Sequence, residues 1–323
     1  MPAHAARPTV GSIRRLSPAL DAVAAPDAKI EQLADGFVWS EGPVWVKDGG
    51  YLVFSDVPAN TMYRWSEADG ASVFLKPSGY DGPPTTVFRE PGSNGLALDA
   101  AGDLLVCDHG NRSLSKVDLK TRKKTILLDR YQGKRFNSPN DLVVAWKGAL
   151  AGAIYFTDPP YGLEGMNASP IKEMAFNGVY LRRPDGSVAV VDDKLTFPNG
   201  LALTPDEKRL YISVSDPDGP VIMAYDLGPD GLPLKSKVFF DAMALHKAGG
   251  PGLPDGMCLD TEGRLYATGP GGVLVITPAG ELIGIIETGQ AVANCAFGED
   301  GSTLFLTSNH TLARVRLKTT GLV

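Results

Sequence analysis

The sequence predicts an all-β fold, a six-bladed β-propeller with four-stranded antiparallel blades, and three observations lead to this prediction. An oxygen-bearing residue stands before a short apolar, strand-like run six times along the chain. The copies are spaced by roughly 40 to 60 residues, which is the repeat length of propeller blades. Between them, alternating apolar residues and Asp-Gly turns are typical of hairpins. The six leading residues are Glu41, Asn94, Asn140, Asn199, Asp255 and Asn294.

Each repeat begins with an expected hairpin of two apolar strands around a turn that carries Asp or Gly. The second strand ends in a small or acidic residue. Alternation of this kind favours strands over helices, and no continuous stretch of the chain has convincing helical periodicity. The six hairpins span residues 42–56, 95–108, 141–158, 200–216, 256–269 and 295–308.

A third strand follows each hairpin, and several repeats add a fourth, which completes the blades. The segment 29–38 is expected to supply the outer strand of the last blade by pairing with the C-terminal segment, so that the ring closes. A single propeller domain is therefore predicted over residues 29–323, after a poorly structured leader over residues 1–28. The third strands are expected in residues 61–70, 113–121, 178–187, 221–231, 272–280 and 311–319, and the fourth strands in residues 72–76, 125–129, 188–192 and 237–241.

The composition excludes several classes of protein. The chain has 323 residues, 43% of them apolar and 21% charged, and its net charge is −6. A nucleic-acid-binding protein needs a basic surface, which this balance argues against. No run approaches the roughly 18 apolar residues of a membrane span. The N-terminal segment lacks the apolar core of a secretory signal, and we expect a cytoplasmic location, with a periplasmic one left open.

A ring of side-chain oxygens suits a hard cation. If the repeats surround an axis, the six leading residues converge at one mouth of the central channel. Glu41 and Asp255 would balance a divalent charge, and Asn carbonyls would add neutral oxygens, a donor set that favours Ca²⁺, with Mg²⁺, Mn²⁺ and Zn²⁺ as alternatives. Turn chemistry is the competing explanation for Asn94, Asn199 and Asp255, which precede Gly. It does not explain Glu41 or Asn140.

Five motifs resemble the gluconolactonase/senescence-marker-protein (regucalcin-like) family, and its bacterial gluconolactonase branch in particular. They are EGPVW, SPNDLVV, FTDPPYGL, PNGLALTPD and LPDGMCLD, in this order along the chain. The resemblance implies a six-bladed propeller that hydrolyses lactones, with a divalent metal held by Glu41, Asn199 and Asp255. It implies that Asn140 is a further ligand or a substrate contact.

The expected reaction is metal-dependent opening of a sugar lactone, a step of carbohydrate metabolism, with the small-molecule lactone as the partner. The metal would polarise the lactone carbonyl, and Asp255 would assist the attack of water as general base. Asp255 as direct nucleophile and a hydroxide activated by the metal remain alternatives. A phosphotriester (organophosphate) hydrolase with a more apolar pocket and a non-catalytic calcium-binding propeller are the competing functions.

Further residues are candidates for binding the substrate. Asn94 belongs to the ring, and Asn140 is shared with the metal. His109 and Arg112 lie on a loop of the second repeat, where a histidine bonded to backbone is the alternative. Tyr161 is expected at the mouth of the pocket or in a packing role. Asn294 is expected to be a structural turn residue, and Asp141 is expected to orient Asn140.

Overall fold

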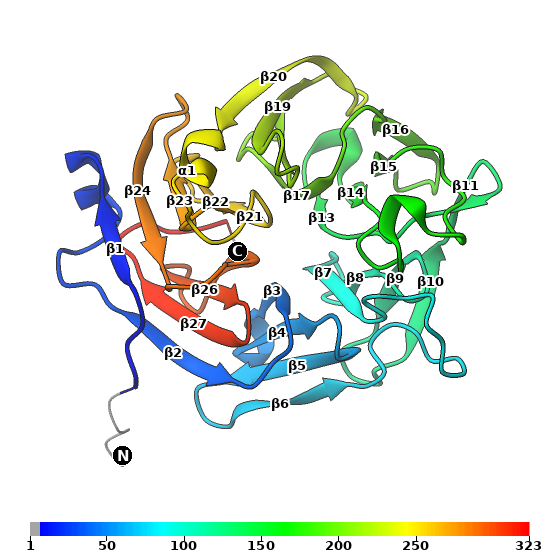
Figure 1. Ribbon diagram of the computed structural model, residues 1–323, viewed down its shortest axis with the longest axis horizontal. Helices are drawn as coiled ribbons and strands as arrows, with labels where there is room; N and C mark the ends of the chain where they lie inside the picture. The colour runs from blue at the N-terminus through cyan, green and yellow to red at the C-terminus, as the bar shows by residue number, and fades with distance from the viewer. Residues whose placement is uncertain (1–6, 323) are drawn as a thin grey trace.

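The computed structural model describes residues 7–322 and confirms the six-bladed β-propeller (Figure 1). Six antiparallel sheets surround a central axis, and in each the innermost strand is the one that begins at or beside a residue of the predicted ring. Blade 1 consists of β3 (Ser40–Val46), β4 (Tyr51–Asp56), β5 (Thr61–Ser66) and β6 (Gly70–Leu75). Blade 2 consists of β7 (Ser93–Leu98), β8 (Leu104–Asp108), β9 (Ser113–Val117) and β10 (Lys124–Leu128). Blade 3 consists of β13 (Leu142–Val144), β14 (Ile154–Asp158), β15 (Gly178–Arg182) and β16 (Val188–Asp192).

The remaining three blades complete the ring. Blade 4 consists of β17 (Pro198–Leu203), β18 (Arg209–Val214), β19 (Val221–Leu227) and β20 (Pro233–Asp241). Blade 5 consists of β21 (Met257–Leu259), β22 (Leu265–Gly269), β23 (Gly272–Ile276), β24 (Leu282–Glu287) and the added strand β1 (Ser12–Arg15). Blade 6 consists of β25 (Asn294–Gly298), β26 (Thr303–Ser308), β27 (Thr311–Arg316) and β2 (Ile30–Asp35).

Other regular elements are short. A two-stranded hairpin, β11 (Arg130–Tyr131) and β12 (Lys134–Arg135), extends from blade 2, and α1 (Met243–Lys247) follows blade 4. Single 3₁₀ turns are η1 (Pro18–Ala22), η2 (Lys47–Gly49), η3 (Gly148–Leu150) and η4 (Met166–Ala168). Within residues 7–322, no helix has the length and apolarity that crossing a membrane requires.

The ring closes as the sequence predicts. β2, from the start of the chain, pairs antiparallel with β27, from its end, and becomes the outer strand of blade 6. Apolar side chains of neighbouring blades fill the space between the sheets: Trp65 of blade 1, for example, packs against Phe305 of blade 6 at a ring distance of 5.7 Å. The core therefore lies between blades, and each blade depends on two neighbours.

The expected poorly structured leader is wrong for residues 7–28. β1 pairs with β24, which makes blade 5 five-stranded rather than four-stranded. Leu20 and Val23, in and just after η1, are both fully buried against blades 5 and 6. This apolar surface explains why the segment is ordered, because its burial offsets the entropy of fixing the backbone. Residues 1–6 of the predicted leader lie outside the described part of the chain.

The inner strands are irregular where they begin, and this irregularity aims side chains at the axis. The pairing of β3 with β4, of β7 with β8 and of β17 with β18 shifts register just after Glu41, Asn94 and Asn199. Bulges of this kind redirect a side chain relative to the regular alternation. The glycines that follow Asn94 and Asn199 allow neighbouring strands to approach closely: a Cβ on Gly200 would lie 2.2 Å from the backbone oxygen of Asp255.

Candidate active site

A cavity of about 490 Å³ opens at the end of the channel where the inner strands begin, and it is called the site cavity below. Five blades each contribute one polar residue to its wall. These residues are Glu41, Asn94, Asn140, Asn199 and Asp255. Five members of the predicted ring therefore meet in one cavity, although they are distant in the sequence. None of the five has a positive φ, so left-handed turn geometry does not account for them.

The three asparagines form a chain of hydrogen bonds across the cavity floor. Asn94 Nδ2 donates to Asn140 Oδ1 at 2.8 Å, and Asn140 Nδ2 donates to Asn199 Oδ1 at 2.5 Å. Asn199 Nδ2 continues the chain to Ser215 Oγ at 2.9 Å. All three amides are buried, so these bonds fix their orientation. The floor is a pre-ordered row of amide groups rather than a set of mobile side chains.

Two carboxylates of the site cavity, Glu41 and Asp255, have raised pKa values. Burial, and then the neighbouring Asp141 carboxylate, raise the pKa of Glu41 to about 8. Burial, and then the charge of Glu41, raise the pKa of Asp255 well above its ordinary value. Glu41 is only 3% exposed, and its Oε2 accepts a hydrogen bond from the amide of Gly42 at 2.8 Å. Among the described residues, no Lys, Arg or His forms an ion pair with either carboxylate.

The donor set fits a hard divalent cation. Among residues 7–322, no three His, Cys, Asp or Glu side chains lie close enough together to hold a metal by themselves. A metal in the site cavity would therefore need amide oxygens, and Asn140 and Asn199 present them beside Glu41 and Asp255. A cation there would lower the pKa of both carboxylates, which burial, and then the neighbouring negative charges, raise. Oxygen-only donors of this kind suit Ca²⁺ or Mg²⁺.

The sixth ring residue, Asn294, has a different place. It lies at the start of β25 and lines a second cavity of about 280 Å³ farther along the inner strands, called the far cavity below. Its Nδ2 donates to Asp141 Oδ2 at 3.4 Å, and its side chain also reaches Glu41. The expectation that Asn294 is a simple turn residue is wrong, because it is a buried strand residue that bridges two carboxylates.

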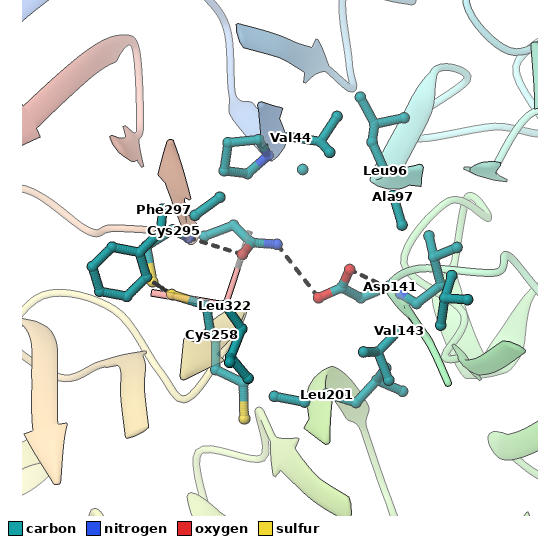
Figure 2. A pocket seen from close by; sticks show the side chains of 18 of the residues that line it. Val44, Leu96, Ala97, Asp141, Val143, Leu201, Cys258, Cys295, Phe297 and Leu322 are labelled. Atoms are coloured by element: carbon teal, nitrogen blue, oxygen red, sulfur yellow. Dashed lines mark hydrogen bonds between the residues drawn. The ribbon is translucent and has the colours of Figure 1, made fainter. Parts of the chain in front are cut away.

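The far cavity is otherwise apolar, as Figure 2 shows. Val44, Leu96, Val143 and Leu201 face its interior from four blades, and the Asp141 carboxylate points into it. Burial raises the pKa of Asp141 to about 7. Asp141 does not orient Asn140 as expected: among the described residues, its carboxylate accepts hydrogen bonds from the amide of Leu142 at 2.9 Å and from Asn294, and it makes none with the Asn140 side chain. Its influence on the site cavity is thus electrostatic, through Glu41 and Asp255.

Two of the predicted substrate residues do not line the site cavity. His109 is fully buried behind the cavity wall, where its Nε2 lies 3.3 Å from Asn140 Oδ1 and 3.4 Å from Asn94 Nδ2. Arg112 points away towards blade 3, and its Nε donates to the backbone oxygen of Phe136 at 2.7 Å. Neither side chain is placed to touch a ligand, so His109 supports the amide row and Arg112 fixes a loop.

Tyr161 does line the site cavity, as predicted. Its ring stacks on Phe197 with centroids 5.9 Å apart. Burial raises the pKa of its hydroxyl, which lies near Ser215 but makes no hydrogen bond of good geometry with the described residues. A buried hydroxyl without a partner is costly in the free protein. It is therefore a group that a ligand oxygen can satisfy.

Sequence reasoning missed several residues of the cavity wall. Glu90 lies in the loop between β6 and β7, and Trp39 and Ser215 lie beside strand ends. The residues Arg89-Glu90-Pro91 form no repeat with the other blades, so the periodicity that revealed the ring could not reveal them. An acidic residue inside a long loop that precedes an inner strand was the available signal.

The chain is similar to known proteins in both sequence and structure. Residues 39–310 match the profile described as the SMP-30/Gluconolactonase/LRE-like region. The chain is 48% identical to a gluconolactonase of Zymomonas mobilis subsp. mobilis, over 97% of this chain and 88% of that protein. Its structure is similar to that of a gluconolactonase from Xanthomonas campestris, with a TM-score of 0.81, 35% identity, and coverage of 98% of this chain and 99% of that chain.

A more distant structure shares the fold. The calcium-binding protein regucalcin from Agrobacterium tumefaciens superimposes with a TM-score of 0.67 and 20% identity, over 90% of this chain and 94% of that chain. At this identity the similarity concerns the fold alone.

Proposed function

The chain belongs to the SMP-30/gluconolactonase/LRE-like family, and on this premise we propose that it is a gluconolactonase-type enzyme that opens a sugar lactone by adding water. One observation on this chain itself supports the proposal, in addition to the family membership. Glu41 and Asp255, two carboxylates without a basic partner among the described residues, share one cavity with an ordered row of amides. This arrangement suits a reaction that needs a cation, a base and hydrogen-bonding groups together.

The proposed cofactor is a divalent cation, with Ca²⁺ favoured by the all-oxygen donor set. Glu41, Asn199 and Asp255 would hold it, with Asn140 as the fourth protein ligand. When bound, such a cation supplies positive charge that stabilises the negative charge developing on the lactone carbonyl oxygen.

The side chains of the protein supply the remaining chemistry. Asp255 is the proposed general base: it accepts a proton from the attacking water, and its partial burial beside Glu41 favours proton uptake. Asn94 and Tyr161 border the same space, where the amide oxygen of Asn94 can accept, and the Tyr161 hydroxyl can donate, a hydrogen bond to the substrate. Hydrogen bonding within the amide row holds Asn94 in place before substrate arrives, which lowers the entropy cost of reaction.

The cavity wall favours a polyhydroxylated lactone over an apolar phosphotriester. Glu90, Asn94, Tyr161 and Ser215 present several polar groups to the cavity, and Trp39 and Tyr161 are aromatic. Such a mixture of hydrogen-bonding groups and aromatic rings is suited to a sugar derivative. An organophosphate would leave these polar groups unpaired, at a cost in affinity.

An acid-release assay with δ-gluconolactone tests the proposal. Wild type is measured after chelation and after Ca²⁺ is restored, beside Asp255→Ala, Glu41→Gln and the exposed control Asp218→Asn. We expect chelation and both site variants to lower the enzymatic rate by about 100-fold or more, and Asp218→Asn to leave it unchanged. A rate that survives both chelation and Asp255→Ala would refute the proposal. Faster turnover of a phosphotriester than of the lactone would favour the alternative function.

A further inference from the structure

Glu90 is a third carboxylate of the site cavity, and its surroundings differ from those of Glu41 and Asp255. Its side chain is 12% exposed and lines the cavity from the β6–β7 loop rather than from an inner strand. Its Oε1 lies 2.7 Å from Arg89 Nη2, and its Oε2 lies 3.5 Å from His109 Nδ1. Glu90 thus has a cationic partner of its own, which the other two lack, so it has less need of a metal for charge compensation.

The loop that carries Glu90 is fixed to a second loop. The amide of Arg89 donates to the backbone oxygen of Gly162 at 3.0 Å, and the amide of Glu164 donates to that of Val87 at 2.9 Å. Phe88 and Leu163 form an isolated antiparallel bridge between the same segments. Tyr161 belongs to the second loop, so residues 87–90 and 161–164 form one unit at the cavity wall. Backbone pairing of this kind holds a loop side chain in position without a strand.

His109 supports Glu90 from behind. It is fully buried, and its Nδ1 makes no hydrogen bond of good geometry with the described residues, although Glu90 Oε2 lies 3.5 Å away. Its other ring nitrogen meets the amides of Asn94 and Asn140. The imidazole therefore connects Glu90 to the amide row. Because its Nδ1 is buried and lacks another hydrogen-bond partner among the described residues, a carboxylate is favoured at the position of Glu90.

We propose that Glu90 is a specificity-determining residue: its carboxylate accepts hydrogen bonds from hydroxyl groups of the lactone, and Arg89 and His109 hold it in place. This inference rests on the proposed lactonase function and adds the basis for choosing a polyhydroxylated substrate. A carboxylate oxygen accepts more than one hydrogen bond, so its contacts with Arg89 and His109 leave acceptor capacity for hydroxyl donors. Sites built to bind hydroxyl groups discriminate strongly against analogues that lack them.

The test compares two lactones with the same ring, δ-gluconolactone and δ-valerolactone, which has no hydroxyl groups. Glu90→Gln keeps the shape of the side chain and removes its charge, and Glu164→Gln, an exposed position in the same pair of loops, is the matched control. We expect Glu90→Gln to raise KM for δ-gluconolactone about tenfold with little change in kcat. The kcat/KM for δ-valerolactone should stay within about twofold of wild type, and the control should resemble wild type with both substrates.

Different failures have different meanings. If the Ca²⁺-loaded wild type hydrolyses neither lactone, the proposed function itself fails, before any variant is compared. Two outcomes with active wild type overturn the inference. Equal loss of activity on both lactones in Glu90→Gln, or weaker Ca²⁺ binding measured by calorimetry, would show that Glu90 acts on the metal or the fold. An unchanged KM for δ-gluconolactone also overturns it. A thermal midpoint like that of wild type confirms that the variant is folded.

Discussion

At the scale of single residues, the central feature is negative charge gathered along the axis of the propeller. Burial raises the pKa of Glu41, Asp141 and Asp255. The charge of Asp141 adds to this effect on Glu41 and Asp255, the charge of Glu41 adds to it on Asp255, and the charge of Glu90 adds to it on Glu41 and Asp255. Folding removes these groups from water and places them together, both of which disfavour the charged forms. In the absence of a cation, these carboxylates therefore lower the free energy of unfolding. Such a trade-off between stability and function is expected of active sites.

This charge predicts how stability depends on pH in the chelated protein. The pKa of Glu41 is about 8 and that of Asp141 about 7 in the folded protein, against ordinary values of 4.5 and 3.8. The folded state thus keeps protons that the unfolded state has released, so stability falls as the pH rises from about 4 to about 8. Thermal unfolding should show the midpoint of wild type falling relative to that of Glu41→Gln over this range.

Added Ca²⁺ should remove most of this difference, because the cation favours the ionised carboxylates. A chelated wild type whose midpoint rises relative to Glu41→Gln between about pH 5 and pH 8 would contradict the account.

At the scale of elements, the N-terminal segment behaves as part of the propeller. β1 extends blade 5, and η1 inserts Leu20 against Gly284 of β24, where a Cβ would lie 2.5 Å from a Leu20 methyl group. A small residue on one element makes room for a large one on the other, which is typical of close packing in protein cores. The segment thus covers apolar surface of blades 5 and 6 that would otherwise face solvent.

Leu20→Ala should therefore destabilise the protein by about 2 to 5 kcal/mol, the cost of emptying a fully buried leucine site. The matched control is Leu16→Ala, four residues earlier and 48% exposed, which should cost less than about 0.5 kcal/mol. Urea unfolding monitored by tryptophan fluorescence measures both. Equal, small effects of the two substitutions would show that the segment does not contribute to the core.

At the scale of the whole molecule, stability depends on the seam where the two ends of the chain meet. Arg314 of β27 binds Glu31 of β2 at 2.9 Å, Glu67 of blade 1 at 2.8 Å and Glu299 of blade 6 at 2.8 Å. Its guanidinium also lies 5.6 Å from the centre of the Trp65 ring. One side chain thus joins the closing strand, its own blade and the next blade, and its network is partly shielded from water.

Arg314→Met should lower the free energy of unfolding by about 1 to 3 kcal/mol, because three carboxylates lose a shared cationic partner. The control is Arg316→Met on the same strand. Its side chain is 62% exposed, pairs with the exposed Asp300 and lies 3.9 Å from Glu299. Exposed pairs contribute less than about 1 kcal/mol, so this change should be small. Denaturant titrations measure the free energy of unfolding of both variants. A clearly larger loss in Arg314→Met would show that the network stabilises the seam, and equal losses would show that it is only a solvated surface network.

The sequence predicts the architecture well because a propeller repeats one local pattern six times. The spacing of Glu41, Asn94, Asn140, Asn199 and Asp255 identified the blades and five residues of the cavity together. What the pattern could not predict depends on contacts between non-equivalent parts of the chain. Glu90 reaches the cavity because its loop pairs with residues 162–164, and His109 lies behind the wall because the same loops cover it.

The ordered structure of the N-terminal segment is a second feature that the sequence pattern could not predict. Its strand β1 is short and half-exposed, and only the apolar surface of blades 5 and 6 gives Leu20 and Val23 a place to be buried. Tertiary context of this kind overrides local signals.

Calorimetric titration of Ca²⁺ into the chelated protein tests the central claim most directly, namely that Glu41, Asn199 and Asp255 hold a divalent cation in the site cavity. Wild type should bind Ca²⁺ at a single site. Glu41→Gln and Asp255→Asn should each weaken binding by about 100-fold or more, since each removes one of two ligand charges, and Asp218→Asn should bind as wild type does. Wild-type protein that binds no divalent cation, or Asp255→Asn protein that binds Ca²⁺ as tightly as wild type, would contradict the account.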